Sequence, residues 1–273
     1  MAKLRLDMLL LQRGLCTSRE QARGLILAGK VTVAGSMVDK AGQAVAEDAV
    51  IAITAPEHNY VSRGGLKLEK ALAEFAVSLA GKSMLDVGSS TGGFTDCALQ
   101  NGAARVIALD VGTGQLDWKL RNDSRVHVME RTNIRHVTPQ DLPFIPDVAS
   151  IDVSFISLKL VLPVVYGLLP EGGEVIALIK PQFEAGKEQV SRGKGVIRDG
   201  AIHRETISAV LVTARETGFA LLGLTWSPIR GPEGNIEFMA WLRKGDLTPL
   251  SSALDQQVFD VVELAHKEFT GEK

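Results

Sequence analysis

From about residue 65 onward, hydrophobic residues recur alternately at strand spacing and at helical spacing. Strands are predicted over 83–87, 105–110, 126–129, 147–152, 173–179, 219–227 and 235–242. Helices are predicted over 65–78, 93–101, 114–121, 157–169 and 200–217, and one more helix closes the chain. This alternation predicts an α/β fold, a doubly wound parallel sheet whose final pair of strands is antiparallel.

The first 55 residues follow a different pattern of shorter segments. The leucines of 6–15 predict one helix, and a second helix is predicted from an N-cap at Ser18 to Gly29. Short strands are predicted at 31–33, 37–38 and 50–53. We therefore predict a small α+β domain at 1–58, a linker at 59–66 and a large domain at 67–273.

The most informative segment is MLDVGSSTGGF at 84–94, which joins a strand to a helix through a glycine loop. The first strand ends at Asp86, the loop holds Gly88 and Gly92, and the next strand ends at Asp110. Such a layout binds a nucleoside-bearing cofactor at the carboxyl edge of a parallel sheet, where the second acid accepts from the ribose hydroxyls. A carboxylate ahead of the loop would repel a pyrophosphate but suits the cationic groups of S-adenosylmethionine. The segment predicts a Rossmann-like methyltransferase, and a tight turn with an unrelated acid downstream is the alternative interpretation.

Four charged residues are predicted at the carboxyl edge of this sheet, where ligands bind. Lys67 lies early in a helix, Asp152 and Lys180 end strands, and Glu237 interrupts an apolar strand. Buried charges are costly unless they are paired, and ligands bind at this edge. The set suits methylation of a ribose 2′-hydroxyl, which must lose a proton to attack a sulfonium methyl group. We predict Lys180 as the general base, with Lys67 favouring its neutral form and steadying the alkoxide, while Asp152 and Glu237 orient the lysines. No metal is required, and exposed strand ends or structural ion pairs are the alternative interpretation.

Charge is distributed unevenly along the chain. The 273 residues carry a formal net charge of −2, which argues against a wholly basic nucleic-acid coat. Residues 1–30, however, hold six Lys or Arg against two Asp or Glu. A phosphate-binding face is predicted there, and a solvated helical face is the alternative. The predicted RNA contacts are Arg5, Arg19, Arg23 and Lys30.

Composition limits the class of protein. The chain has only two cysteines, so no disulfide framework is expected. It shows no secretory signal and no apolar stretch long enough to span a bilayer, so we expect a cytoplasmic protein with no membrane partner. No obligate protein partner is evident. The glycine-rich, basic segment 184–198 predicts a mobile loop over the site.

The N-terminal sequence resembles the alpha-L RNA-binding module that occurs in a ribosomal protein and in many pseudouridine synthases. The shared features are R-L-D at 5–7, S-R-E-Q-A at 18–22 and the glycine–valine pattern from Leu27 to Gly35. This resemblance implies binding of structured RNA through shape and phosphates.

The large domain resembles the hemolysin A family of ribosomal RNA 2′-O-cytidine methyltransferases with an FtsJ-like catalytic domain. The matching segments are SRGGLKL at 62–68, DVGSSTGGF, IDVSFISL at 151–158, IKPQFEAGKEQV at 179–190 and GPEGNIEFMAWL at 231–242. The resemblance implies a Lys-Asp-Lys-Glu tetrad at Lys67, Asp152, Lys180 and Glu237, S-adenosylmethionine as cofactor, and ribosomal RNA or ribosomal subunits as substrate. It also places Asn133 where the family has an acid beside the adenine. The predicted cofactor contacts are Asp86, Gly88, Ser89, Ser90, Thr91, Gly92, Phe94, Asp110, Asn133 and Asp152.

Two other interpretations stay open at the level of sequence. One is an RNA-binding assembly factor that keeps the methyltransferase fold without turnover, although its intact tetrad argues against it. The other, suggested by the family name, is a membrane-active protein, for which the chain offers no strongly amphipathic cationic helix.

Overall fold

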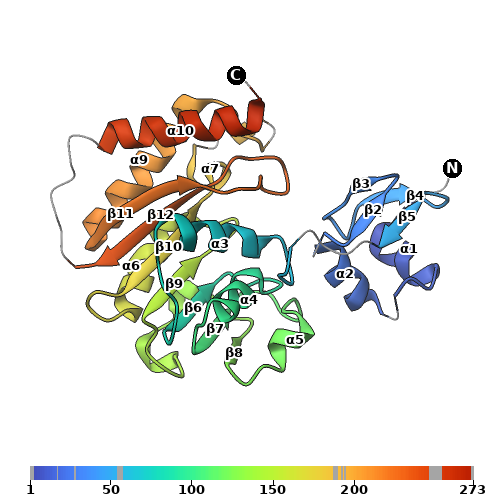
Figure 1. The fold of residues 1–273 in the computed structure, drawn as a ribbon, viewed down its shortest axis with the longest axis horizontal. Coiled ribbons are helices and arrows are strands. Elements are labelled where there is room, and N and C mark those ends of the chain that lie inside the picture. Colours follow the sequence, from blue (N-terminus) through green and yellow to red (C-terminus); the bar gives the residue numbers. More distant parts are fainter. Residues whose placement is uncertain are drawn as a thin grey trace.

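The computed structural model contains a large domain and a small N-terminal domain that lie beside each other (Figure 1). It describes residues 3–16, 18–27, 29–53, 58–186, 190–191, 193, 195–245 and 254–271. Parts of the predicted mobile loop, namely 187–189, 192 and 194, lie outside the described residues. The mobility of that loop therefore stays a prediction.

The large domain is built on a seven-stranded sheet in the order β11-β12-β10-β9-β6-β7-β8. The five adjacent strands β10, β9, β6, β7 and β8 run parallel to one another. Strand β12 is antiparallel to both of its neighbours, β10 and β11. The predicted doubly wound sheet with an antiparallel final pair is thus confirmed. The strands are β6 (Ser83–Val87), β7 (Arg105–Leu109), β8 (Val126–Met129), β9 (Val148–Ile151), β10 (Glu174–Ile179), β11 (Phe219–Trp226) and β12 (Phe238–Lys244).

Helices cover both faces of this sheet, which explains why its strands read as nearly continuous apolar runs. Alternate residues of each strand point to opposite faces: in β10, Val175 and Ala177 join one core cluster while Ile176 and Leu178 join the other. The first cluster packs under α6 (Leu158–Leu168), α9 (Gly200–Thr217) and α10 (Leu254–Thr270). The second packs under α3 (Gly64–Glu74), α4 (Gly93–Gln100) and α5 (Trp118–Arg121). Shorter helices are α7 (Pro181–Glu184), η1 (Ile134–His136) and η2 (Pro139–Asp141).

Two helices are shorter than the sequence pattern predicts. The helix expected over 114–121 begins only at Trp118, because Gly114 has a φ of +68° and Asp117 caps the helix by accepting from the Lys119 amide. The helix expected over 65–78 ends at Glu74, and Ala76 has a left-handed φ of +53°. This helix also begins inside the predicted linker, and Tyr60 packs in the large domain's core, so part of 59–66 belongs to the large domain.

The small domain is an α+β unit with its own core of Leu6, Leu9, Leu10, Ala22 and Ile26. The predicted helices and three of its strands are present, whereas the pair β1–β4 was not predicted. Its elements are β1 (Lys3–Arg5), α1 (Leu6–Gln12), α2 (Arg19–Leu27), β2 (Val31–Val33), β3 (Ser36–Met37), β4 (Ala44–Ala46) and β5 (Ile51–Ile53).

A buried carboxylate, Asp7, ties α1 to α2 in this domain. Its oxygens accept from the Arg5 guanidinium at 2.9 and 3.0 Å and from Nε of Arg19 at 3.0 Å. The hydrogen bond from Arg5, helped by Arg19 and opposed by burial, lowers the pKa of Asp7 to about 2. Two of the four predicted RNA contacts, Arg5 and Arg19, therefore have a structural role in the fold.

Asp7→Asn is expected to destabilise the small domain by about 1.5–3 kcal/mol at neutral pH, the range for hydrogen bonds to charged groups. Because the folded-state pKa is lowered, this stabilisation is fully present above the unfolded value of about 3.9 and is lost as the pH falls towards 2. Amide hydrogen exchange of residues 3–53 measured between pH 7 and pH 3 would show faster opening in the variant at neutral pH. Equal exchange in both proteins would contradict a stabilising role for Asp7.

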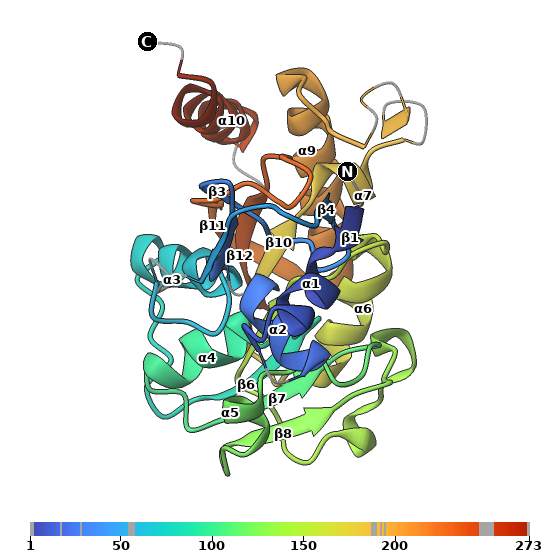
Figure 2. The same cartoon turned by 90° about the vertical axis from the view of Figure 1, so that its right-hand side faces the viewer.

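Two ion pairs connect the small domain to the large domain. Arg63, the N-cap of α3, donates to Asp39 at 2.6 Å, and Lys40 pairs with Glu233 in the loop before β12. Seen from the side of the small domain, α1 and α2 lie in front of the large domain's sheet (Figure 2). The small domain is thus positioned by contacts to segments that lead into two of the four predicted catalytic residues.

Candidate active site

Sheet topology brings the four predicted catalytic residues together. Asp152 and Lys180 follow the neighbouring parallel strands β9 and β10, so both lie at the same edge. In the antiparallel pair of β10 with β12, Ile179 lies opposite Phe238, which places Glu237 across from Lys180. Lys67 reaches the same point from the second turn of α3.

The four side chains form a chain of alternating charge. The Nζ atom of Lys67 lies 2.6 Å from Oε2 of Glu237 and 3.8 Å from Oδ2 of Asp152. The Nζ atom of Lys180 lies 2.5 Å from Oδ1 of Asp152 and donates to Oγ of Ser154 at 3.2 Å. Asp152 is therefore the carboxylate shared by both lysines.

The electrostatics of the site distinguish the two lysines. Burial alone would lower the pKa of Lys67, but the carboxylates of Asp152 and Glu237 outweigh it and leave the pKa raised. The pKa of Asp152 is lowered, because the charges of Lys180 and Lys67 outweigh the effect of burial. Lys67 is thus held as an ammonium between two carboxylates, whereas Lys180 contacts one carboxylate and a hydroxyl. Lys180 is the better candidate for the proton acceptor.

The glycine loop between β6 and α4 presses directly on this cluster. Gly88 has a φ of +86°, and a Cβ there would lie 2.5 Å from the backbone oxygen of Asp152. Gly92 has a φ of +94°, and a Cβ there would lie 2.3 Å from a methyl group of Leu120. Only glycine satisfies both the conformation and the close approach at these two positions. The loop predicted to bind the cofactor therefore lies against the residue that both lysines share.

Asp110, predicted to bind the cofactor ribose, links two loops at this edge. Its Oδ2 accepts from the amide of Ser90 in the glycine loop at 2.8 Å, and its Oδ1 accepts from the amide of Gly112 at 2.7 Å. The side chain is half-buried, and each carboxylate oxygen has a second lone pair for another donor. The geometry suits a contact with ribose hydroxyls, and that contact stays a prediction.

Asp86 lies beneath the loop rather than facing open space. It is fully buried, its oxygens accept from Thr95 at 2.7 Å and Ser150 at 2.8 Å, and burial raises its pKa to about 6. In this structure the carboxylate supports the loop from below, which differs from the predicted direct contact with cationic groups of the cofactor. The two hydrogen-bond partners come from α4 and β9, a juxtaposition that the sequence pattern does not reveal.

The other predicted cofactor contacts lie in different surroundings. The side chain of Phe94 is buried in the core under α3 and α4, so only its backbone is available to a ligand. Asn133 is half-buried and caps η1 by accepting from the Arg135 amide at 3.1 Å. Ser89 and Thr91 are buried and Ser90 is exposed within the glycine loop.

Among the described residues, no group of His, Cys, Asp and Glu is arranged to hold a metal ion.

Phe155, which lies three residues beyond Asp152, is a candidate site residue that the sequence pattern does not predict. Its side chain is 91% exposed, its backbone has a left-handed φ of +63°, and its ring centroid lies 5.0 Å from that of Phe183. An exposed aromatic ring in a strained turn beside Lys180 is available to stack on a base. The feature that indicates such a residue is the segment DVSF, in which the aromatic Phe155 follows shortly after the charged residue that ends a strand.

Comparison with known proteins matches two segments of the chain to protein families. Residues 60–244 match the FtsJ-like methyltransferase family, and residues 4–51 match the S4 domain. A protein of Bacillus subtilis with the provisional name rRNA methyltransferase YqxC is 49% identical, over 97% of this chain and 95% of that protein. The 16S/23S rRNA (cytidine-2'-O)-methyltransferase TlyA of Mycobacterium tuberculosis is 46% identical, over 88% of this chain and 90% of that protein.

One solved structure matches nearly the whole fold. A protein from Streptococcus thermophilus with the provisional name hemolysin is 47% identical and superimposes with a TM-score of 0.79, covering 99% of this chain and 98% of that chain. Within the part of this chain that the structure describes, no helix has both the length and the apolar character needed to cross a bilayer.

Proposed function

We start from family membership: this chain belongs to the FtsJ-like methyltransferase family, and we propose that it methylates a ribose 2′-hydroxyl in ribosomal RNA with S-adenosylmethionine as donor. Relatives named for cytidine 2′-O-methylation of 16S and 23S rRNA support cytidine as the target. The S4 domain supports an RNA substrate. Ribosomes lie in the cytoplasm, so we also propose that location.

One observation carries this proposal: the Asp152–Lys180 pair, 2.5 Å apart, lies directly against the glycine loop. A loop that binds a methyl donor would hold the donor beside a buried lysine. The acceptor carboxylate of Asp110 at the same edge fits the hydroxyls of a nucleoside. The Asp110 carboxylate and the geometry of the glycine loop therefore fit S-adenosylmethionine. When bound, this cofactor supplies an electrophilic methyl group.

The residues of the cluster then have distinct tasks. Lys180 accepts the proton of the 2′-hydroxyl as its oxygen attacks, and later releases that proton to water. Lys67, held as a cation, stabilises the negative charge that develops on the oxygen. Asp152 and Glu237 fix the positions of the two lysine nitrogen atoms, and Lys180 reacts as the neutral amine. Because transfer is direct, alignment of the hydroxyl contributes much of the rate.

The proposal is tested by transfer of a labelled methyl group to ribosomal RNA from a strain that lacks the modification. Free RNA, isolated subunits and whole ribosomes are offered separately, so that the preferred form of the substrate is identified. Label in the RNA with the full chain, and none with Lys180→Ala, is the expected result. An assembly factor without turnover would bind the RNA and leave it unlabelled, which would contradict the proposal.

Asp110→Ala is expected to weaken S-adenosylmethionine binding by about 1–3 kcal/mol, the scale of losing a hydrogen bond to a charged group. Calorimetry measures this directly. Because Asp110 also holds Ser90 and Gly112, Asp110→Asn serves as the matched variant, since it keeps the shape and one acceptor oxygen. Wild-type affinity in both variants would remove Asp110 from the cofactor site.

A further inference from the structure

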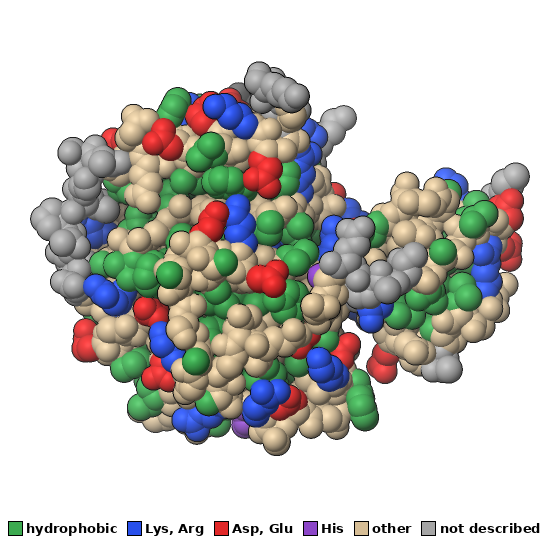
Figure 3. All heavy atoms as spheres, viewed as in Figure 1, with side chains coloured by type: hydrophobic (Ala, Val, Ile, Leu, Met, Phe, Trp, Pro, Cys, Tyr) green, Lys and Arg blue, Asp and Glu red, His purple; other side chains and the backbone are tan. Residues whose placement is uncertain are grey.

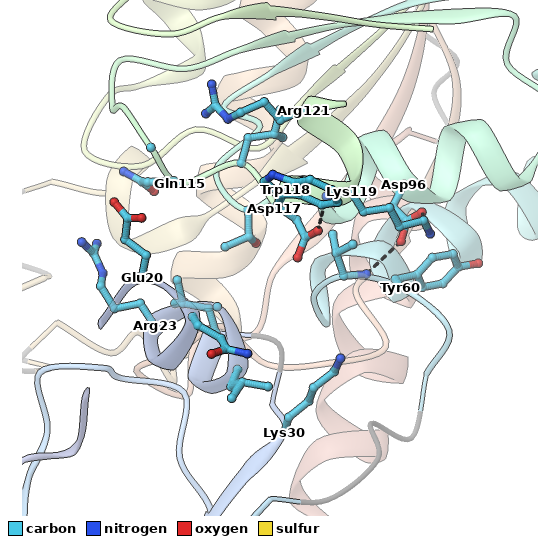
Figure 4. A pocket seen from close by; sticks show the side chains of 18 of the residues that line it. Glu20, Arg23, Lys30, Tyr60, Asp96, Gln115, Asp117, Trp118, Lys119 and Arg121 are labelled. Carbon is cyan, nitrogen blue, oxygen red and sulfur yellow. Dashed lines mark hydrogen bonds and ion pairs between the residues drawn. The ribbon is translucent and has the colours of Figure 1, made fainter. Parts of the chain in front are cut away.

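A cavity lies away from the tetrad, between the two domains (Figure 4). It has a volume of about 1040 Å³ and is lined by α2 of the small domain and by α5 and the segment before it in the large domain. Thr91 of the glycine loop also lines it, but Asp110 and Asp152 do not. The cavity thus begins beside the predicted cofactor loop without being part of it. We call it the interdomain groove.

An exposed tryptophan forms part of the wall of the interdomain groove. Trp118 is the first residue of α5, and its side chain is 77% exposed. The helix is held in place by the Asp117 cap and by packing of Leu120 in the core. An exposed aromatic ring on a helix that is fixed in this way offers a flat surface on which a base can stack. Its face is available for stacking.

Positive charge lies on both walls of the groove. The side chains of Arg23 and Lys30 in the small domain have no hydrogen-bond or ion-pair partner among the described residues. Lys119 stands on the opposite wall, 3.4 Å from the buried carboxylate of Asp96, and keeps two thirds of its side chain exposed. Glu20 is an exposed acid on the same surface. Lys and Arg side chains are also visible at the junction of the domains in Figure 3.

We propose that the interdomain groove binds an unpaired segment of RNA, with a base stacked on Trp118 and phosphates on Arg23, Lys30 and Lys119. An aromatic platform between cations is the pattern that binds single-stranded nucleic acid, because every base has a stacking face and every linkage a charge. Both domains contribute, so the groove would guide a strand from the S4 domain to the glycine loop. The inference rests on the proposed function for its RNA substrate.

The test measures binding of the full-length chain to an unstructured 12-nucleotide oligouridylate and to an RNA hairpin of equal length. Trp118→Ala is expected to weaken single-strand binding by about 5- to 100-fold, the range for loss of one base-stacking contact, and to change hairpin binding much less. Trp118→Phe should restore most of the affinity. Phe259→Ala, which removes another exposed aromatic residue on the distant α10, is the control and should bind as the wild type.

Two further readouts separate stacking from a general loss of structure. Oligouridylate should quench the tryptophan fluorescence of the wild type, and this quenching should be reduced in Trp118→Phe. Arg23→Ala and Lys30→Ala should each reduce the slope of log affinity against log salt by about 1. Failure of the wild type to bind oligouridylate, or binding by Trp118→Ala within twofold of the wild type, would overturn the groove proposal.

Methyl transfer to ribosomal RNA, measured on the same samples, distinguishes this proposal from the proposed function. A wild type that methylates RNA while Trp118→Ala binds oligouridylate normally would refute the groove alone. A wild type that binds oligouridylate through Trp118 but transfers no methyl group would refute the function alone.

Discussion

Lys180→Ala should lower the rate of methyl transfer by at least roughly 10²–10⁴-fold, the usual contribution of a general base. The affinity for S-adenosylmethionine should change little, because Lys180 contacts Asp152 and Ser154 rather than the predicted ribose site. Single-turnover rates on ribosomal RNA and calorimetry measure the two quantities separately. Lys159→Ala, a change at an exposed lysine on the adjacent helix α6, is the matched control and should remain active.

The pH dependence identifies which lysine accepts the proton. The carboxylates of Asp152 and Glu237 raise the pKa of Lys67, so we expect Lys67 to stay charged and a rate that rises with pH to report another group. That rise should disappear in Lys180→Ala, and Lys180→Arg should not restore activity, because a guanidinium stays protonated. An active Lys180→Arg enzyme with the wild-type pH profile would assign the base elsewhere.

Removal of residues 1–58 is expected to abolish methylation of ribosomal RNA while leaving the affinity for S-adenosylmethionine within about twofold, since the S4 domain lies in this segment. The shortened protein should fold, because the two core clusters of the large domain begin at Tyr60. Equilibrium binding of cofactor and methyl transfer to RNA are the two measurements. Methylation of ribosomal RNA at the full-length rate would show that the small domain has another task.

Loss of the interdomain ion pairs is a second possible cause of inactivity in the shortened protein. The full-length variant Asp39→Asn with Glu233→Gln weakens both pairs and keeps the predicted RNA contacts. If this variant stays active, the effect of the truncation is a loss of RNA binding. If it is as inactive as the truncation, positioning of α3 and of the loop before β12 is responsible.

The sequence predicted the sheet and the proximity of the four candidate catalytic residues for a simple physical reason. The carboxyl ends of parallel strands lie at the same edge of the sheet. A charged residue directly after an apolar strand, such as Asp152 or Lys180, therefore lies at that edge. Glu237 was identifiable because a buried acid in an apolar strand needs a partner, and Lys67 is that partner.

What the sequence did not reveal depends on contacts between distant segments. Asp86 turned inward because Thr95 and Ser150 supply hydrogen bonds beneath the loop. Arg19 matched an RNA-binding pattern, yet it also closes an ion pair with Asp7 in the neighbouring helix. Trp118 lies in a groove that exists only because α2 of the small domain stands opposite α5. Such arrangements leave no local pattern of hydrophobic and polar positions.

The position of the transferred methyl group tests the central claim most directly. Ribosomal RNA from an unmodified strain is incubated with the full chain and labelled S-adenosylmethionine, digested to nucleosides and separated by mass. The proposed chemistry of Lys180 and Asp152 predicts label in 2′-O-methylcytidine and its absence with Lys180→Ala. Label on a base, or unlabelled RNA with the wild-type protein, would contradict it.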